Sequence, residues 1–407
     1  MPAILIFKLP IAASGFKQEL CAKAVASVAA ILVILFALLP FSADYATFFR
    51  EYKSVRYFAT PITPIYSLIK LSSSAMPHHL VNQTIAARSV FDDEVNEAQE
   101  DGYELIVMIV GETVRADHLG INGYERQTTP RLAATEHLVF FSNFSSCGTS
   151  TAVSVPCMFS PFGRQEFSDE AIFSTENVLD VLARNNVAVL WRDNNSSSKG
   201  VADRATYQSF KHPDINPVCT PECRDEGMLA GLDDYIANHA GQDIFIILHA
   251  MGSHGPEYYK RYPKAYDRFQ PSCRTNHLKQ CSREELRNSY DNTILYADSF
   301  IADTIEFLKS YQHYETALIY VSDHGESLGE NGLYLHGLPY KFAPKAQKHV
   351  AALGWLPPNS DFDLAKTKDQ ATAAFSHDNL YCSLLATFEI NVESCKTVAP
   401  ILVLKEY

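Results

Sequence analysis

The stretch Thr316-Ala317-Leu318-Ile319-Tyr320-Val321-Ser322-Asp323-His324-Gly325 decides the fold. Its first six residues form an almost continuous apolar run, which is typical of a parallel strand covered on both faces. An acid, an imidazole and a glycine follow at the point where the strand would end. Three other runs show the same pattern: Tyr103–Val110 before Glu112, Val187–Leu190 before Trp191-Arg192-Asp193-Asn194-Asn195, and Ile244–His249 before Gly252-Ser253-His254-Gly255.

Longer stretches with helical character separate these strands: Val178–Asn185, Asp225–Ala240 and Arg283–Tyr311. Alternating strands and helices predict an α/β fold, with a mostly parallel sheet flanked by helices. In open sheets of this kind, ligands bind beyond the carboxyl ends of the strands. We therefore expect the polar residues after the four strands to gather at one edge.

Composition limits the class of protein. The chain has 407 residues, of which 47% are hydrophobic and 20% charged. That content is enough for a large core and excludes intrinsic disorder. The net charge of −13 argues against a nucleic-acid partner, which would require a basic face.

The N-terminal region predicts one transmembrane helix. Residues 24–43 carry no charge and are long enough, at about 1.5 Å per residue, to cross a hydrocarbon layer of about 30 Å. A buried core helix and a cleaved signal peptide are the alternatives. Lys8, Lys17 and Lys23 precede the span against one acid, Glu19, so residues 1–23 are expected on the cytoplasmic side.

Two further segments follow this span. Residues 44–100 begin rich in aromatic and basic side chains, which predicts a linker at the membrane interface; an ordinary linker is the alternative. Residues 101–407 would then form the large folded domain, outside the cytoplasm.

The cysteines agree with an oxidising compartment. Cys21 precedes the span, and the other eight follow it as close neighbours: Cys147 with Cys157, Cys219 with Cys223, Cys273 with Cys281, and Cys382 with Cys395. An even number outside the membrane favours disulfides, and pairing between nearest neighbours is the simplest of many connectivities. A zinc ribbon is the alternative, but only the Cys219–Cys223 spacing comes near to one.

Asp323, His324 and Glu112 form a candidate metal site. Carboxylate and imidazole ligands suit Zn²⁺, which keeps one position open in catalytic sites. Each of these residues alone would more often be a surface or hydrogen-bonding group.

The segment Cys147–Cys157 adds a candidate nucleophile. Its hydroxyl residues could attack phosphorus, or one could simply cap a helix, and its low apolar content argues against a core element. The residues alone do not distinguish Thr149, Ser150, Thr151 and Ser154.

Taken in order, the motifs resemble those of the phosphoethanolamine transferases. This family modifies lipid A and includes the mobile colistin-resistance enzymes, and its catalytic domain belongs to the alkaline phosphatase/sulfatase superfamily. The resemblance rests on Val110-Gly111-Glu112-Thr113, the Cys147–Cys157 segment, Trp191-Arg192-Asp193-Asn194-Asn195, Gly252-Ser253-His254-Gly255-Pro256, Ser322-Asp323-His324-Gly325-Glu326, Leu335-His336-Gly337 and Ser376-His377-Asp378-Asn379.

The resemblance implies a role for each matched residue. Zinc would be bound by Glu112, Thr151, Asp323 and His324, and Thr151 would be the nucleophile. His254 and His336 would lie near the transferred phosphate, where they could hold a second zinc. Asn195, Ser196, Lys199 and Glu326 would lie beside the substrate. We expect His249, His377 and Asp378 to be structural.

The same resemblance implies a reaction and a location. Phosphoethanolamine would pass from phosphatidylethanolamine to a lipid A phosphate of lipopolysaccharide, through a covalent intermediate on Thr151, with polymyxin resistance as the result. The enzyme would be a monomer in the bacterial inner membrane, with its catalytic domain in the periplasm. The alternatives are a sister enzyme acting on core heptose or another glycan, a phosphoglycerol transferase, and an inactive remnant. Family members carry more N-terminal membrane helices than this chain has room for, so we expect it to be the end of a longer protein.

Overall fold

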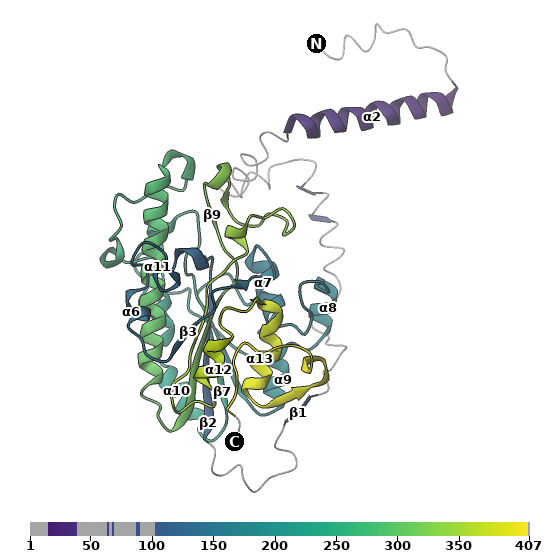
Figure 1. Ribbon diagram of the computed structural model, residues 1–407. Helices are drawn as coiled ribbons and strands as arrows, with labels where there is room; N and C mark the ends of the chain where they lie inside the picture. Colours follow the sequence, from purple (N-terminus) through teal and green to yellow (C-terminus); the bar gives the residue numbers. More distant parts are fainter. Residues whose placement is uncertain (1–14, 39–62, 65–66, 69–86, 90–101, 406–407) are drawn as a thin grey trace. The chain divides into compact units, whose positions relative to one another are not determined.

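The computed structural model describes residues 15–38, 63–64, 67–68, 87–89 and 102–405 (Figure 1). The chain divides into two compact units, residues 1–58 and residues 59–407. In the first unit the described part is helix α2 (Phe16–Leu38). The second unit contains the α/β domain that carries the predicted site.

A seven-stranded sheet forms the centre of the α/β domain, in the order β3-β11-β8-β2-β7-β5-β6. Strands β8, β2, β7, β5 and β6 are parallel to their neighbours in this order, whereas β11 runs antiparallel to both β8 and β3. The strands are β2 (Tyr103–Gly111), β3 (Leu138–Phe140), β5 (Ala188–Asp193), β6 (Thr206–Ser209), β7 (Ile244–His249), β8 (Tyr314–Ser322) and β11 (Ala352–Trp355). The predicted mostly parallel sheet is confirmed.

Helices cover both faces of this sheet, so the domain has three layers (Figure 1). On one face α7, α9 and α13 pack against side chains such as Val110, Trp191 and Val321. On the other face α10 and α11 pack against side chains such as Leu105, Leu190 and Leu318. The helices are α6 (Pro130–Ala133), α7 (Thr151–Met158), α8 (Asp169–Ser174), α9 (Val178–Arg184), α10 (Leu232–Asn238), α11 (Arg283–Leu308), α12 (Leu364–Asp369) and α13 (Leu380–Thr387).

Short two-stranded ladders close the periphery. β1 (Ala87–Ser89) pairs with β13 (Ile390–Val392), β9 (Ser327–Leu328) with β10 (Tyr334–Leu335), and β4 (Phe144–Ser145) with β12 (Phe375–Ser376). The β4–β12 pair is parallel and lies just before the segment that leads to α7.

Three sequence predictions about elements need correction. The strand predicted at 187–190 extends to Asp193, because Arg192 and Asp193 still pair with β7. The helix predicted at 225–240 is broken, because Gly231 adopts a left-handed φ of 68° between a 3₁₀ turn and α10. The segment 147–157 was expected to lie outside the core, but residues 151–158 form α7.

Helix α7 is mostly buried, although few of its residues are large and apolar. Val155 and Met158 are fully buried in the cluster beneath it. The polar residues Thr151 and Ser154 lie in its first turn, which is why composition alone concealed a core helix.

The disulfide prediction is confirmed. The bonds join Cys147 with Cys157, Cys219 with Cys223, Cys273 with Cys281, and Cys382 with Cys395. Cys21 is free and exposed in α2.

In the described part of the chain, no helix is long and apolar enough to cross a membrane. The predicted span, residues 24–43, overlaps α2 up to Leu38, and its last five residues lie outside the described residues. Most of the predicted linker 44–100 and of the predicted segment 1–23 also lies outside them.

Candidate active site

The predicted site residues lie at the carboxyl ends of the parallel strands. Glu112 follows β2 and Asp323 follows β8, and these strands pair in register as far as Gly111 and Ser322. The backbone N–H of Asp323 donates to the Gly111 carbonyl at 2.8 Å, which holds the two strand exits together. Both carboxylates are fully buried.

Thr151 is the hydroxyl residue that meets these groups. It is the first residue of α7, and its Oγ1 donates to Glu112 Oε2 at 3.1 Å and lies 3.4 Å from His324 Nε2. Thr149 instead donates to the Leu338 carbonyl, and the Ser154 hydroxyl accepts from the Gly148 N–H. Ser150 precedes the helix but its side chain forms no capping hydrogen bond.

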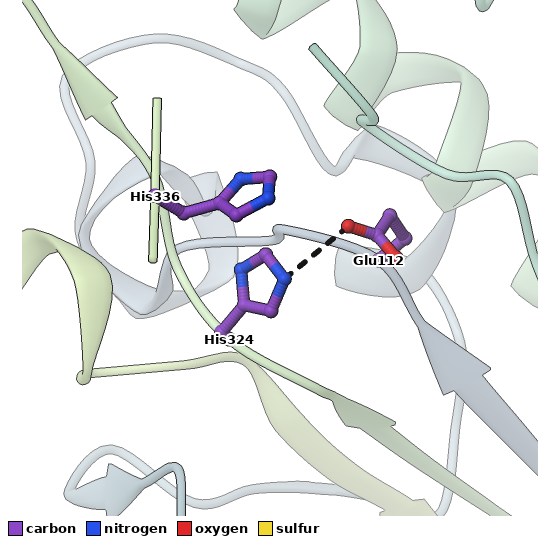
Figure 2. Close-up of side chains that lie close together, drawn as sticks. All are labelled: Glu112, His324 and His336. Carbon is purple, nitrogen blue, oxygen red and sulfur yellow. Dashed lines mark ion pairs between the residues drawn. The ribbon is translucent and has the colours of Figure 1, made fainter. Parts of the chain in front are cut away.

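The arrangement around His324 fits a cation (Figure 2). His324 Nδ1 donates to the Gly325 carbonyl at 3.0 Å, because a carbonyl can only accept, and this contact leaves Nε2 facing the carboxylates. His324 Nε2 lies 3.4 Å from Glu112 Oε1 and 3.3 Å from Asp323 Oδ2. Neither oxygen has a hydrogen-bond partner, although both are buried. Two carboxylate oxygens and an imidazole nitrogen that converge in a buried space match the donor set of a zinc site.

His336 adds a fourth side chain to this cluster. Glu112, His324 and His336 each offer a ligand atom, and these atoms all lie within 4.8 Å of one another (Figure 2). The rings of His324 and His336 are 4.1 Å apart between centroids.

The pKa values of the two carboxylates shift in opposite directions. Burial alone would raise the pKa of Glu112, but the neighbouring His324, His254 and His336 and a hydrogen bond from Asn195 lower it to about 2. Burial, together with the Glu112 charge, raises the pKa of Asp323 well above its ordinary value. A divalent cation would allow both to be ionised.

His254 lies near His336, on another loop at the edge of the cluster. His254 Nδ1 donates to the Gly255 carbonyl at 2.7 Å, and the rings of the two histidines are 6.2 Å apart. His336 Nδ1 lies 3.3 Å from Glu326 Oε1. Burial raises the pKa of Glu326 to about 8, partly offset by the charges of His324 and His254.

The loop after β5 divides its predicted substrate residues between two sides. Asn195 is 2% exposed, and its Nδ2 donates to Glu112 Oε2 at 2.7 Å and to the Ala250 carbonyl at 2.8 Å. Ser196 is exposed, and Lys199 Nζ donates to its carbonyl and its hydroxyl, both at 2.6 Å. Asn195 therefore supports a carboxylate, while Ser196 and Lys199 lie on the solvent side.

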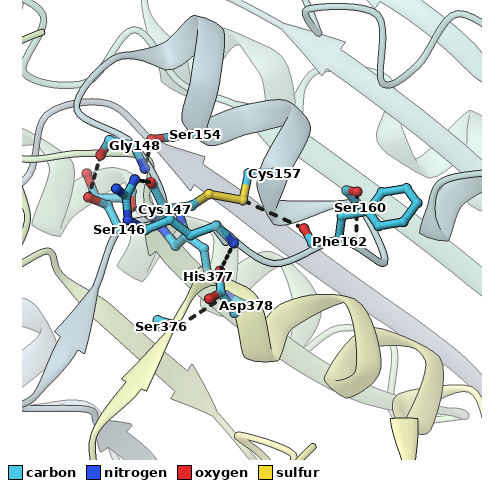
Figure 3. Close-up of a disulfide and its surroundings, with 12 residues drawn as sticks. Ser146, Cys147, Gly148, Ser154, Cys157, Ser160, Phe162, Ser376, His377 and Asp378 are labelled. Atoms are coloured by element: carbon cyan, nitrogen blue, oxygen red, sulfur yellow. Dashed lines mark hydrogen bonds between the residues drawn. A yellow bond between two sulfur atoms is a disulfide. The ribbon is translucent and has the colours of Figure 1, made fainter. Parts of the chain in front are cut away.

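His249 and His377 make structural contacts. His249 Nδ1 lies 3.0 Å from Asp193 Oδ2, beneath the site. His377 Nδ1 accepts from the Cys147 N–H, and its Nε2 donates to the Ser322 carbonyl, both at 3.0 Å. His377 thereby joins the disulfide-bonded segment to the end of β8; Figure 3 shows His377 beside Cys147. The exposed Asp378 accepts from the Arg164 N–H at 2.9 Å.

Sequence reasoning missed two residues that hold the site loops. Gln347 is fully buried and donates to the Ser327 hydroxyl and the Leu335 carbonyl. Arg115 donates to the Glu326 carbonyl and pairs with Asp117. The sequence signal for Arg115 was its position, three residues after Glu112, in a chain of net negative charge.

Two family models match the chain. The sulfatase family model matches residues 104–390, and a model described as phosphoethanolamine transferase EptA/EptB matches residues 1–76. Together they cover the α/β domain and the N-terminal region.

Among curated relatives, phosphatidylethanolamine transferase Mcr-1 of Escherichia coli is 43% identical over 382 residues, covering 91% of this chain and 69% of the relative. Phosphoethanolamine transferase EptA of Escherichia coli K12 is 41% identical over 389 residues, covering 93% of this chain and 70% of the relative.

The solved structures agree. The soluble domain of lipooligosaccharide phosphoethanolamine transferase A from Neisseria meningitidis superposes with a TM-score of 0.74 at 37% identity, over 80% of this chain and 98% of that one. The integral membrane form of that protein has a TM-score of 0.75 at 34% identity, over 98% of this chain and 75% of that one. The chain thus belongs to the phosphoethanolamine transferase family and has its sulfatase-type catalytic domain.

Proposed function

We propose that this transferase moves phosphoethanolamine from phosphatidylethanolamine to a phosphate of lipid A, through a covalent intermediate on Thr151. The observation that carries the proposal is the position of Thr151 Oγ1, 3.1 Å from Glu112 Oε2 and 3.4 Å from His324 Nε2. A buried hydroxyl in contact with a carboxylate and an imidazole is arranged for nucleophilic attack.

In the first half-reaction, Thr151 Oγ forms a bond to the phosphorus of the donor and the bond to the diacylglycerol oxygen breaks. Thr151 Oγ–H already donates to Glu112, which orients the hydroxyl, and the hydroxyl proton passes to water when Oγ bonds to phosphorus. One flanking imidazole, His254 or His336, in its protonated form gives one proton to the departing oxygen of diacylglycerol and regains one from water. In the second half-reaction an acceptor phosphate oxygen displaces Thr151, which recovers its proton.

Glu112, Asp323 and His324 would hold Zn²⁺ together with Thr151, and the ion would lower the pKa of the hydroxyl and offset charge on the phosphoryl group. As an alternative to this proton transfer, His254 and His336 could hold a second ion. Lys199, on the solvent side, would attract the phosphate. Its pKa is lowered by burial, and the charges of Asp193, Glu112 and Asp323 partly offset this.

The location follows from the same proposal. Four disulfides require an oxidising compartment, which for an enzyme acting on lipid A is the periplasm. The N-terminal region, matched by the EptA/EptB model over residues 1–76, would anchor the enzyme in the inner membrane, where both lipids lie. We expect a monomer.

The test is intact-protein mass spectrometry of the purified chain with phosphatidylethanolamine. The wild type should acquire one phosphoethanolamine, and Thr151→Ser should still acquire it because the hydroxyl is kept. Thr151→Ala should acquire none. An adduct that persists on the alanine variant would show that the nucleophile is another residue.

A second measurement addresses the acceptor and the competing interpretations. Phosphoethanolamine found on the lipid A released from cells by mild acid supports the proposed acceptor, whereas label that stays with the core sugars indicates the heptose alternative. A purified chain that binds zinc but turns over no donor would be an inactive remnant. In cells, activity on lipid A should lower polymyxin susceptibility.

A further inference from the structure

One loop beside the site is held rigidly but ends in an exposed aromatic side chain. Residues 336–348, here called the flanking loop, follow β10 and contain His336 at their start. Their base is fixed by the buried Gln347, whose Nε2 donates to the Leu335 carbonyl at 3.0 Å and whose Oε1 accepts from the Leu338 N–H at 3.3 Å. The loop continues the chain from β9 and β10, on the β9 side of the domain (Figure 1).

The flanking loop touches the segment that carries the nucleophile. Thr149, two residues before Thr151, donates to the Leu338 carbonyl at 2.6 Å. The Arg164 guanidinium stacks 3.3 Å from the centre of the Tyr340 ring and also donates to the Cys147 carbonyl at 2.8 Å. The position of the loop is therefore coupled to the position of Thr151.

Phe342 projects from the tip of this loop. Its side chain is 75% exposed, more than any other large hydrophobic residue in the described range 102–405. The N–H groups of Phe342 and Ala343 both donate to the Pro339 carbonyl, at 2.8 and 3.0 Å, and Ala343 is buried. The turn that buries Ala343 thus leaves Phe342 outside.

The charge of the flanking loop is opposite to that of the chain. Exposed lysines, Lys341 and Lys345, stand on either side of the Phe342–Pro344 tip. No Asp or Glu occurs anywhere from Asn331 to Ser360, whereas the whole chain has a net charge of −13. An aromatic tip between two lysines is complementary to an anionic lipid surface.

We propose that residues 338–345 are a membrane-contact element that seats Thr151 against an anionic phospholipid bilayer. Phe342 would enter the boundary between headgroups and acyl chains, and Lys341 and Lys345 would lie among the lipid phosphates. This inference rests on the proposed function, because a lipid donor brings its phosphate no farther than the headgroup layer. The contacts of Leu338 and Tyr340 with the nucleophile segment would then hold Thr151 at that depth.

The test uses the full chain in vesicles of phosphatidylethanolamine and phosphatidylglycerol. Trp191 and Trp355 are buried, so Phe342→Trp adds one reporter at the loop tip. Brominated acyl chains should quench most of the added emission. The native tryptophans provide the baseline, measured in the wild type.

Turnover gives an independent readout. Each basic residue near an anionic surface contributes measurably to binding, so Lys341→Glu with Lys345→Glu should lower turnover of long-chain donor in vesicles by about tenfold or more. Turnover of a short-chain, water-soluble donor should not change. The matched control is Lys366→Glu with Lys368→Glu, two exposed lysines on α12.

The two failures can be told apart. If bromolipid leaves Phe342→Trp unquenched, or if the lysine variants slow both donors equally, the loop does not contact the bilayer, although the transferase proposal stands. Absence of quenching is also the result expected if another part of the chain, or a second copy of it, covers Phe342. If the wild type turns over neither donor, the proposed function fails, and quenching alone still decides the position of the loop.

Discussion

Substitution of Asn195 tests whether this residue supports Glu112 or binds the substrate. Its side chain is 2% exposed and donates to Glu112 Oε2 at 2.7 Å and to the Ala250 carbonyl at 2.8 Å. The sequence placed it beside the substrate phosphate. The structure instead predicts that Asn195→Ala weakens metal binding, because Glu112 loses the donor that orients it.

The magnitude follows from that hydrogen bond. A hydrogen bond to a charged group contributes about 1.5–3 kcal/mol, which corresponds to roughly a 10- to 150-fold change in an equilibrium constant. Loss of a residue that orients a metal ligand typically lowers affinity by about 10- to 100-fold. Zinc affinity of Asn195→Ala should therefore fall by about 10- to 100-fold. The zinc affinity of Asn195→Asp should fall further, because a second carboxylate would then face Glu112 with no hydrogen-bond donor between them.

The assay is a zinc titration of the metal-stripped full chain against a chromophoric chelator, with donor KM measured at saturating zinc. Ser196→Ala is the matched control, since its exposed neighbouring side chain does not contact Glu112. If Asn195→Ala keeps its zinc affinity and raises only the donor KM, the structural reasoning is wrong and the sequence interpretation is right.

Three further predictions concern the frame of the site. Burial lowers the pKa of His377 to about 3, below about 6.5 in the unfolded chain, so the unfolded state binds more protons and stability falls as the pH drops below about 6.5. Between pH 7.5 and 4.5, the free energy of unfolding measured in urea should fall by about 3 kcal/mol more for the wild type than for His377→Gln. Equal decreases in the two proteins would contradict this. Replacing Cys147 and Cys157 together by Ser should lower the free energy of unfolding by about 3 kcal/mol, from the chain-entropy relation for a separation of 10 residues. An unchanged midpoint of urea unfolding would argue against this. Gln347→Leu should lower the free energy of unfolding by about 2–5 kcal/mol, because the Leu335 carbonyl and the Ser327 hydroxyl lose a buried donor and the Leu338 N–H loses its acceptor. Calorimetry of the wild type and the variant checks this.

The strand exits were predictable because a parallel sheet brings all its carboxyl ends to one edge. Glu112, Asp323 and His324 lie together for that reason, and the apolar runs before them are long enough to identify. The antiparallel strand β11 was not predictable in the same way. It is four residues long, and its sequence, Ala352-Leu353-Gly354-Trp355, contains no β-branched residue.

The direction of a side chain beyond the end of a strand was the weaker inference. Asn195 and Ser196 are adjacent, yet one is buried against Glu112 and the other faces solvent. Residue type does not decide between these orientations, because both side chains hydrogen-bond readily. Here the Ala250 carbonyl and the Glu112 carboxylate both need a donor, and that need arises only once β2, β5 and β7 are assembled.

The alternation of side chains along the strands explains why the nucleophile comes from α7. Side chains two residues apart on a strand share a face, so each polar group continues a row that begins in the core. These rows are Val110 and Glu112, Trp191 and Asp193, Ile247 and His249, and Val321 and Asp323, and the apolar member of each belongs to the same buried cluster. The helices over that face are α7, α9 and α13, and α7 begins with Thr151 against Glu112. The Cys147–Cys157 bond and His377 hold the approach to that helix, so the hydroxyl is positioned by the same layer that stabilises the fold.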